Sequence, residues 1–328
     1  NIIDWFAIVT TIVLQTLFFT VGMQYNKKII NFSAMTVYAG MLIFFFVVLL
    51  SDVKITTQAF SNIFILNNFL DVNNLAPLLT VAGTIFAYFS ILIISFGDFS
   101  RYVKNEQELK KGNLSLILNL IIFSFLSVFI VIGSDVFLNQ KFSDIDRIFT
   151  NPTDIVGKFD NIQITIVVLF FIIIASASTN LVANFIPSQY SLINFAPSIL
   201  SLKSASYLIA FFGLLIAIFW LTILSQIGIL SFVDTFGAFF GPLFGVMAAD
   251  YYLIKNQELS NKDLYSLDKD SAYYYSGGWH IKGVYSLILG FIFSASTIWN
   301  TNLMFLQSYA WIIGAFVAWI TYYLLAKK

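Results

Sequence analysis

Nine long runs of apolar residues constrain this chain more than any other feature of its sequence. The hydrocarbon core of a bilayer is roughly 30 Å thick, and a helix needs about 20 apolar residues to cross it. Lipid offers no hydrogen-bond partners, so a backbone that crosses it must satisfy its own polar groups, and each run is expected to be helical. The runs cover approximately residues 5–23, 33–51, 76–97, 114–133, 162–184, 205–224, 228–254, 283–299 and 303–326.

The composition agrees with an integral membrane protein rather than a soluble domain, and a membrane enzyme would need a buried acid–base or metal cluster. Hydrophobic residues make up 59% of the 328 residues and charged residues only 10%, whereas a soluble domain is typically about a quarter charged. There is no cysteine, which excludes disulfides and thiolate metal sites. The single histidine, His280, has no obvious partner for acid–base or metal chemistry and is interpreted as a loop residue. The longest hydrophilic stretch, 255–282, is too short for a separate catalytic domain.

The basic residues between the runs predict the orientation. If the loop after the first run is cytoplasmic, thirteen of the 17 lysines and arginines lie on the cytoplasmic side. Cytoplasmic loops typically carry such an excess, so we expect the C-terminus inside the cell and residue 1 outside. An external start at Asn1 without a signal peptide suggests an excerpt or a truncated product, with an odd number of helices missing upstream.

Two stretches that mix polar and apolar residues are expected to lie along the membrane surface. Residues 56–70 would do so on the outside, and residues 185–200 on the inside. Pro187 and Pro197 should limit the length of any helix in the second stretch.

The run over 162–184 ends in an unusually polar stretch, ASASTNLVAN. On a helix, Ala175, Ser178 and Thr179 share one face. Their two hydroxyls, with a backbone carbonyl nearby, suit a hard cation such as sodium. Asn180 and Asn184 lie on a neighbouring face, where amides can donate to and accept from a polar heteroatom ring. Close helix packing is the alternative explanation, and spacing alone favours it.

A second stretch, FAYFSILIISFGDFSRYVK over 86–104, combines aromatic and charged residues. Asp98 and Arg101 are three residues apart, so they can pair with each other or with a moving partner. The alternative is a solvated helix end. Tyr88 and Phe89 can form a stacking platform, although aromatic residues in membrane helices usually face lipid or the protein core.

The stretch FGPLFGVMAADYYLIK over 240–255 contains residues that weaken a helix. Gly241, Pro242 and Gly245 permit either close packing or a bend. Asp250 is expected near the inner membrane interface. Asp234, at the outer end of the same run, is interpreted as interfacial.

Five stretches, taken in order, resemble the nucleobase:cation symporter-1 family, which carries hydantoins, allantoin, uracil, cytosine and similar compounds. They are GDFSRYVK at 97–104, NPTDIVGKF at 151–159, ASASTNLVANFIPSQYSLINFAPSIL at 175–200, GPLFGVMAADYYLIK at 241–255 and YYYSGGWHIKGVYSLILG at 273–290.

This resemblance implies an all-α integral membrane transporter of twelve helices, ten of which form two inverted five-helix repeats. The nine runs would then be the fourth to twelfth helices, the first three would be missing, and residues 1–328 would form a single transmembrane domain.

The resemblance also implies a cation site and part of a substrate site at the end of run 162–184. The carbonyl of Ala175 and the hydroxyls of Ser178 and Thr179 match the sodium ligands of the family. Asn184 matches the amide that hydrogen-bonds the substrate ring.

The rest of the implied substrate site lies on run 76–97. Phe89 falls where the family places an aromatic residue that stacks on the ring. Ala87 and Tyr88 fall where a broken helix exposes backbone to the substrate, although many members have glycine at the position of Ala87. Gating or structural roles are expected for Asp98, Arg101, Gly241 and Pro242.

The implied function is symport of a nucleobase or a related planar nitrogen heterocycle by alternating access. Sodium is the expected coupling ion, with the proton as the alternative, and no other cofactor is expected. Such a permease would lie in the inner (plasma) membrane, would bind no nucleic acid and would not be an enzyme. Two rival interpretations are a transporter of amino acids or amines on the same fold, which should show an intramembrane carboxylate, and a non-transporting truncated homologue.

Overall fold

The computed structural model describes residues 2–20, 23–51, 53–54, 57, 61, 71, 75–141, 156–158, 161–220, 226, 229–266 and 268–327. The chain divides into two compact units. Unit 1 comprises Asn1–Asn68 and Asp98–Ile218, and unit 2 comprises Phe69–Gly97 and Phe219–Lys328. Two stretches singled out in the sequence fall largely outside the described residues. Of 56–70 only 57 and 61 are described, and of 151–159 only 156–158.

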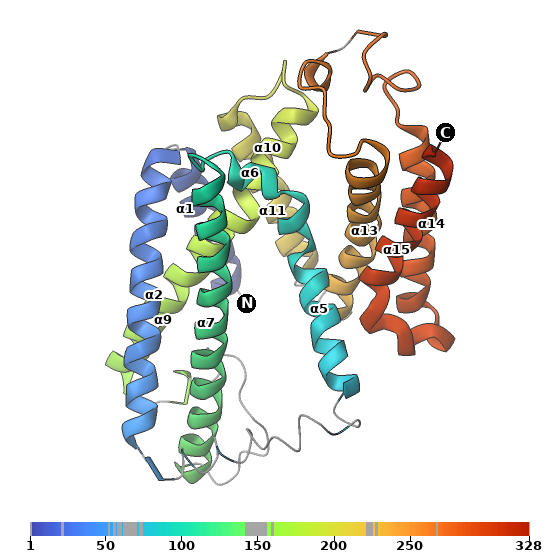
Figure 1. Ribbon diagram of the computed structural model, residues 1–328. Helices are drawn as coiled ribbons and strands as arrows, with labels where there is room; N and C mark the ends of the chain where they lie inside the picture. Colours follow the sequence, from blue (N-terminus) through green and yellow to red (C-terminus); the bar gives the residue numbers. More distant parts are fainter. Residues whose placement is uncertain are drawn as a thin grey trace. The chain divides into compact units, whose positions relative to one another are not determined.

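Unit 1 is built around three long helices. Helix α2 packs against both α7 and α9, and α2 and α7 run side by side (Figure 1). Helix α9 passes without interruption into a π-helix, η2, and then into α10. The elements of unit 1 are α1 (Ile2–Thr20), α2 (Met23–Ser51), α7 (Glu106–Lys141), α9 (Ile162–Asn180), η2 (Leu181–Phe185), α10 (Ile186–Phe195) and α11 (Leu202–Phe219), whose last residue lies across the unit boundary.

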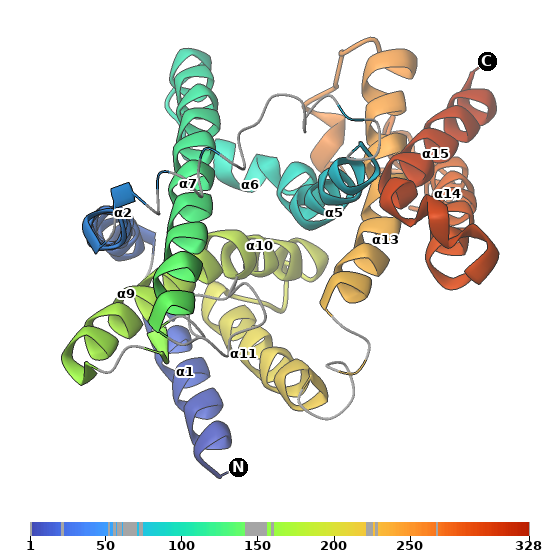
Figure 2. The same cartoon turned by 90° about the horizontal axis from the view of Figure 1, so that it is seen from below.

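Unit 2 is a bundle in which α13 contacts α5, α14 and α15 (Figures 1 and 2). Its elements are α5 (Leu75–Ile94), α13 (Ile229–Ala249), the π-helix η4 (Asp250–Ile254), the short 3-10 helix η5 (Asp263–Tyr265), α14 (Ile281–Trp299), the 3-10 helix η6 (Thr301–Tyr309) and α15 (Ala310–Ala326). Helix α6 (Phe96–Ser100) straddles the boundary between the units, because Gly97 belongs to unit 2 and Asp98 to unit 1.

The expected all-α membrane class is confirmed. Among the described residues the regular elements are helices, apart from one isolated bridge between Ser276 and Trp279. Eight of the described helical segments are long and apolar enough to cross a bilayer, and α1 contributes a shorter apolar stretch, Trp5–Leu17. The inverted repeat and the single-domain organisation stay predictions.

Helix ends differ from the apolar runs wherever polar residues extend a helix beyond the lipid-like stretch. Helix α7 starts eight residues before its run, because Asn105 caps it through a bond from the Glu108 backbone N–H to Asn105 Oδ1 at 2.9 Å. Ion pairs from Glu106 to Lys110 and from Glu108 to Lys111 support this exposed first turn. Helix α10 ends at Phe195, two residues before Pro197, as expected.

Small residues bring the helices of unit 2 into backbone contact. A Cβ atom at Gly241 would lie 2.4 Å from the Trp311 carbonyl oxygen, and one at Gly245 would lie 2.1 Å from the Ala315 carbonyl oxygen. Pro242 is fully buried inside α13, and a Cβ at Gly314 would lie 2.8 Å from its ring. Van der Waals packing of this kind holds helices together where lipid removes the hydrophobic driving force. The close packing predicted for Gly241 and Gly245 is thus confirmed.

Candidate functional site

The predicted cation ligands lie together at the end of α9 in unit 1. Ser178 Oγ donates a hydrogen bond to the Ala175 carbonyl oxygen at 3.0 Å. Ser178 is half-buried and Thr179 is exposed. The hydroxyl and the carbonyl that were predicted to share a cation therefore lie within contact distance of each other, with hydroxyl lone pairs still available. A role as sodium ligands stays a prediction.

Immediately after these residues the helix widens into a feature that the sequence did not reveal. Residues Leu181–Phe185 form a π-helix, closed by a bond from the Ile186 N–H to the Leu181 carbonyl. π-Helical turns are rare and often mark functional sites. This turn carries Asn184, so the predicted substrate-binding amide lies on an irregular segment adjoining the predicted cation ligands.

Three amides form a chain that fixes the orientation of Asn184. Asn184 Nδ2 donates to Asn180 Oδ1 at 2.8 Å, and Asn180 Nδ2 donates to Gln15 Oε1 on α1 at 2.9 Å. Asn184 is exposed, whereas Asn180 is half-buried. With one Nδ2 hydrogen engaged, the Oδ1 of Asn184 is an acceptor that can receive an N–H from a ring. Gln15 lies 165 residues from Asn180 and could not be singled out from the sequence.

The predicted aromatic residues lie on α5 in unit 2. Tyr88 is 61% exposed and Phe89 is half-buried. Their ring centroids are 5.2 Å apart, and the ring planes meet at 80°. The two rings thus form a corner rather than the expected flat platform. A planar ligand that stacks on one ring would meet the other ring edge-on, which is also a favourable aromatic geometry.

The helix break expected at Ala87 and Tyr88 is absent, because α5 is continuous from Leu75 to Ile94 and the turn comes at Ser95. Alanine lacks the conformational freedom that glycine would give at position 87. Ala87 is also buried, and a Cβ at Gly237 of α13 would lie 2.4 Å from the Ala87 Cβ. The Ala87 carbonyl accepts a bond from Ser90 Oγ at 2.6 Å, so its oxygen has a partner within the helix.

Asp98 and Arg101 pair with each other in unit 1. The sequence had left open whether they pair with each other or with a moving partner. Arg101 Nη2 lies 2.9 Å from Asp98 Oδ1, and the Arg101 guanidinium covers the Tyr190 ring at 4.3 Å. The Tyr102 and Tyr190 hydroxyls also contact each other. Burial raises the pKa of the Asp98 carboxyl, and the Arg101 charge opposes this only in part. These contacts join the segment after α6 to α10.

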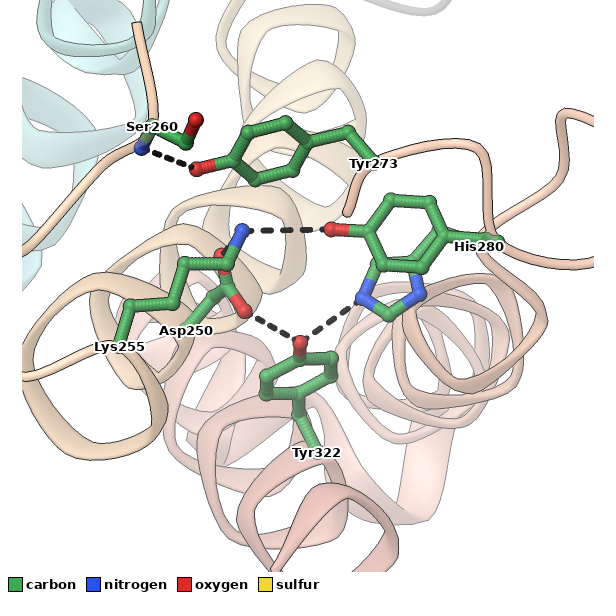
Figure 3. A network of polar contacts seen from close by, with 7 residues as sticks. Asp250, Lys255, Ser260, Tyr273, His280 and Tyr322 are labelled. Atoms are coloured by element: carbon green, nitrogen blue, oxygen red, sulfur yellow. Dashed lines mark hydrogen bonds and ion pairs between the residues drawn. The ribbon is translucent and has the colours of Figure 1, made fainter. Parts of the chain in front are cut away.

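Beyond the C-terminal end of α13, unit 2 contains a polar network that the sequence did not predict (Figure 3). Lys255 Nζ lies 2.8 Å from Asp250 Oδ2, and Tyr322 donates to Asp250 Oδ1 at 2.5 Å. His280 Nε2 lies 2.8 Å from the Tyr322 hydroxyl. His280 lies in the loop just before α14, as expected, but the interpretation that it has no partner was wrong. Its partner lies 42 residues away, and only the packing of α15 against α13 and α14 brings the two together.

Aromatic rings enclose this network. The Tyr275 ring stacks on His280 at 3.9 Å between centroids, and Lys255 Nζ lies 4.2 Å above the Tyr273 ring. Burial lowers the pKa of His280 below its usual value. Burial is also the largest influence on the pKa of Lys255 and lowers it, but contacts with Asp250 and Tyr275 outweigh burial and raise that pKa. The network ties the ends of three helices to the loop before α14.

Asp234, which was interpreted as interfacial, is buried inside the protein. Its side chain lies in α13 with the residue only 7% exposed, and Gln307 Nε2 on η6 donates to its Oδ2 at 2.7 Å. The sequence pattern shows an acid near a helix end and gives no sign that η6 folds over it.

The predicted site residues divide between the two units. Ala175, Ser178, Thr179 and Asn184 belong to unit 1, and the aromatic residues of α5 belong to unit 2. In the part of the chain that the structure describes, no group of three or more His, Cys, Asp or Glu side chains is placed to hold a metal ion.

The sequence matches a known family of permeases. The sequence profile described as "Permease for cytosine/purines, uracil, thiamine, allantoin" matches residues 1–314. The chain belongs to this permease family. The resemblance inferred from the five stretches is thereby confirmed.

Curated permeases are similar to this chain over three quarters of its length. The allantoin permease of Bacillus subtilis (strain 168) is 28% identical over 244 residues, which cover 74% of this chain and 48% of that protein. The purine-uracil permease of Arabidopsis thaliana is 26% identical, over 74% of this chain and 41% of that protein. A putative allantoin permease of Escherichia coli (strain K12) is 26% identical, over 76% of this chain and 50% of that protein. The chain spans about half the length of these permeases. No solved structure matches it.

Proposed function

We propose that the whole protein containing this chain is a secondary transporter that imports a neutral planar nitrogen heterocycle together with a cation. Membership of the permease family carries this proposal. Within unit 1, the amide chain that ends at Asn184 offers one kind of contact that such a ring needs, and within unit 2 the aromatic corner on α5 offers another. One contact is polar and directional, and the other is a flat apolar face.

Sodium is the coupling ion that we propose, held by the Ala175 carbonyl and the hydroxyls of Ser178 and Thr179. These oxygens lie at the end of α9, and η2 with Asn184 follows directly. A cation that fixes the last turn of α9 would therefore also fix the segment that presents the Asn184 amide. Each ligand would then raise the affinity for the other by the same factor. The corresponding coupling free energy is typically about 1–3 kcal/mol.

The membrane placement follows from the charge distribution between the helices. We propose an inner (plasma) membrane location, with the C-terminus on the cytoplasmic side, because thirteen of 17 basic residues gather on that side. Alternating access would then carry substrate between the two faces of the membrane.

Uptake assays test the proposal. Cells that express the full-length protein should accumulate at least one of radiolabelled uracil, cytosine, allantoin or hydantoin, and uptake should rise with external sodium. Cells that carry the empty vector give the background. If none of the four is carried but an amino acid or an amine is, the proposed substrate class is wrong.

A further inference from the structure

Asp234 is an acid placed where a charge is costly. It lies within the apolar span Phe232–Ile254, and the residue is only 7% exposed. One turn further along α13, Ala238 belongs to a fully apolar cluster with Ile298 and Ala310. Ionisable residues inside membrane spans are rare, and where they occur they usually serve ion or proton pathways.

Among the residues that the structure describes, Asp234 has a hydrogen-bond partner but no ion-pair partner. Its partner is the neutral amide of Gln307. The ion pairs among the described residues join other groups, namely Asp98–Arg101, Glu106–Lys110, Glu108–Lys111 and Asp250–Lys255. An unpaired carboxylate in such a place is strongly disfavoured, and a buried acid avoids the cost by binding a proton.

Other titratable groups on the elements around α13 are few. The nearest in sequence to Gln307 is Tyr309, also on η6, and α5 carries only Tyr88. Helix α14 carries Lys282 and Tyr285, and α15 carries Tyr322 and Tyr323, all toward the ends of these helices away from η6. Among the described residues, the acid at position 234 is thus bonded to a neutral amide, and the other titratable groups on these elements are tyrosines and one lysine.

The hydrogen bond from Gln307 connects Asp234 to α5 through η6. Gln307 is followed by Ser308, whose Oγ donates to Thr80 Oγ1 at 3.0 Å. A Cβ atom at Gly83 would lie only 1.7 Å from the Ser308 carbonyl oxygen, so η6 and α5 are in backbone contact. A nine-residue 3-10 helix is unusually long, and long 3-10 segments often mark hinges.

We propose that Asp234 is a proton-binding site at the outer end of unit 2, and that its neutral form holds η6 closed on α13 and α5. Loss of the proton would leave a carboxylate that needs water, which favours separation of η6 from α13. Because α5 carries Phe89, the proton would influence the aromatic half of the proposed substrate site. This inference rests on the proposed function only for its effect on transport.

Infrared spectroscopy tests proton binding without any transported substrate. Difference spectra of the purified full-length protein between acidic and alkaline buffer should contain a protonated-carboxyl band that Asp234→Asn removes and Asp234→Glu shifts. Asp270→Asn, which changes an exposed loop acid, should leave the band in place. A band that survives Asp234→Asn, or that does not move in Asp234→Glu, overturns the proposal.

Transport provides the second test, in proteoliposomes with equal sodium on both sides and radiolabelled allantoin or another heterocycle that the parent carries. Uptake by the parent should fall as external pH rises, whereas uptake by Asp234→Asn should persist and become independent of pH, because the amide mimics the neutral acid. A parental pH profile in Asp234→Asn overturns the proposal. The proposal is also overturned if the parent takes up a cationic amine and Asp234→Asn abolishes that uptake, because Asp234 would then bind the substrate. If the parent carries none of the heterocycles, the proposed function fails, but the infrared result still decides proton binding.

Discussion

At the scale of single residues, hydrogen bonds made inside the protein decide what a side chain can offer a ligand. Asn184 donates to Asn180, which donates to Gln15, so the acceptor oxygen of Asn184 is available to a ring N–H. Ser178 donates to Ala175, so its lone pairs are available to a cation. Asn184 and Ser178 are therefore oriented by hydrogen bonds to neighbouring residues, and for Ser178 that neighbour, Ala175, is itself a proposed cation ligand.

Removal of the two hydroxyls at the end of α9 should abolish sodium stimulation of uptake. In Ser178→Ala/Thr179→Ala a cation would lose two of its oxygens, while the alanines preserve helix and membrane insertion. Initial uptake rates against external sodium measure the effect. Ser176→Ala, an exposed neighbour on another face, is the matched control and should keep the parental response. Unchanged sodium dependence in the double variant would show that these residues serve helix packing.

Loss of the ring at Phe89 should weaken substrate binding by about ten-fold or more. Aromatic stacking contributes about 0.5–1.5 kcal/mol beyond the buried area, which Phe89→Ala also removes, and about 1.4 kcal/mol corresponds to ten-fold in affinity. Phe89→Trp should retain most of the affinity. Binding isotherms with each heterocycle provide the measurement. If Phe89→Ala binds every candidate as well as the parent does, the residue faces lipid or the protein core.

At the scale of elements, irregular helical segments occur where the site residues are. Helix α9 widens into the π-helix η2 at Asn184, α5 breaks at Ser95, and α15 is preceded by the 3-10 helix η6 that covers Asp234. Regular helices surround these segments and are joined by close backbone contacts at glycines. The regular parts supply rigidity, and the irregular parts expose backbone or re-aim side chains.

The glycine contacts between α13 and α15 should be required for stability. Gly245→Ala would place a Cβ 2.1 Å from the Ala315 carbonyl oxygen, and such overpacking typically costs about 1–3 kcal/mol. Gly213→Ala, in α11, meets no atom within 4 Å and should be neutral or stabilising, because alanine favours helix over glycine by about 1 kcal/mol. Thermal unfolding in detergent compares the two. Equal midpoints would contradict the close approach of α13 and α15.

At the scale of the whole molecule, the proposed orientation in the membrane rests on the distribution of basic residues, and the proposed site residues fall in both units. Unit 1 contains the proposed cation ligands and the amide, and unit 2 contains the aromatic residues and Asp234. The chain passes between the units after residue 68, within α6 and at the end of α11.

Cysteine labelling should reveal the orientation. The chain has no cysteine, so single cysteines can be introduced into the full-length protein after any others are removed. Lys54→Cys should react with a membrane-impermeant thiol reagent on intact cells, and Asp270→Cys should react only after the membrane is opened. Both parent residues are exposed. The reverse pattern would invert the proposed topology.

The sequence alone determined the all-α membrane class, the approximate helix positions and the family, because a bilayer demands long apolar helices and because the five stretches occur in family order. It also placed Ser178 beside Ala175, since helical periodicity is local. Only the tertiary structure brought Gln15 to Asn180, His280 to Tyr322 and Gln307 to Asp234. These partners are between 42 and 165 residues apart. The break expected at Ala87 was misplaced for the same reason, because the packing of Ala87 against Gly237 on another helix supports a continuous α5. Periodicity reports which face a residue occupies, but the partner that meets that face is decided by how the helices pack.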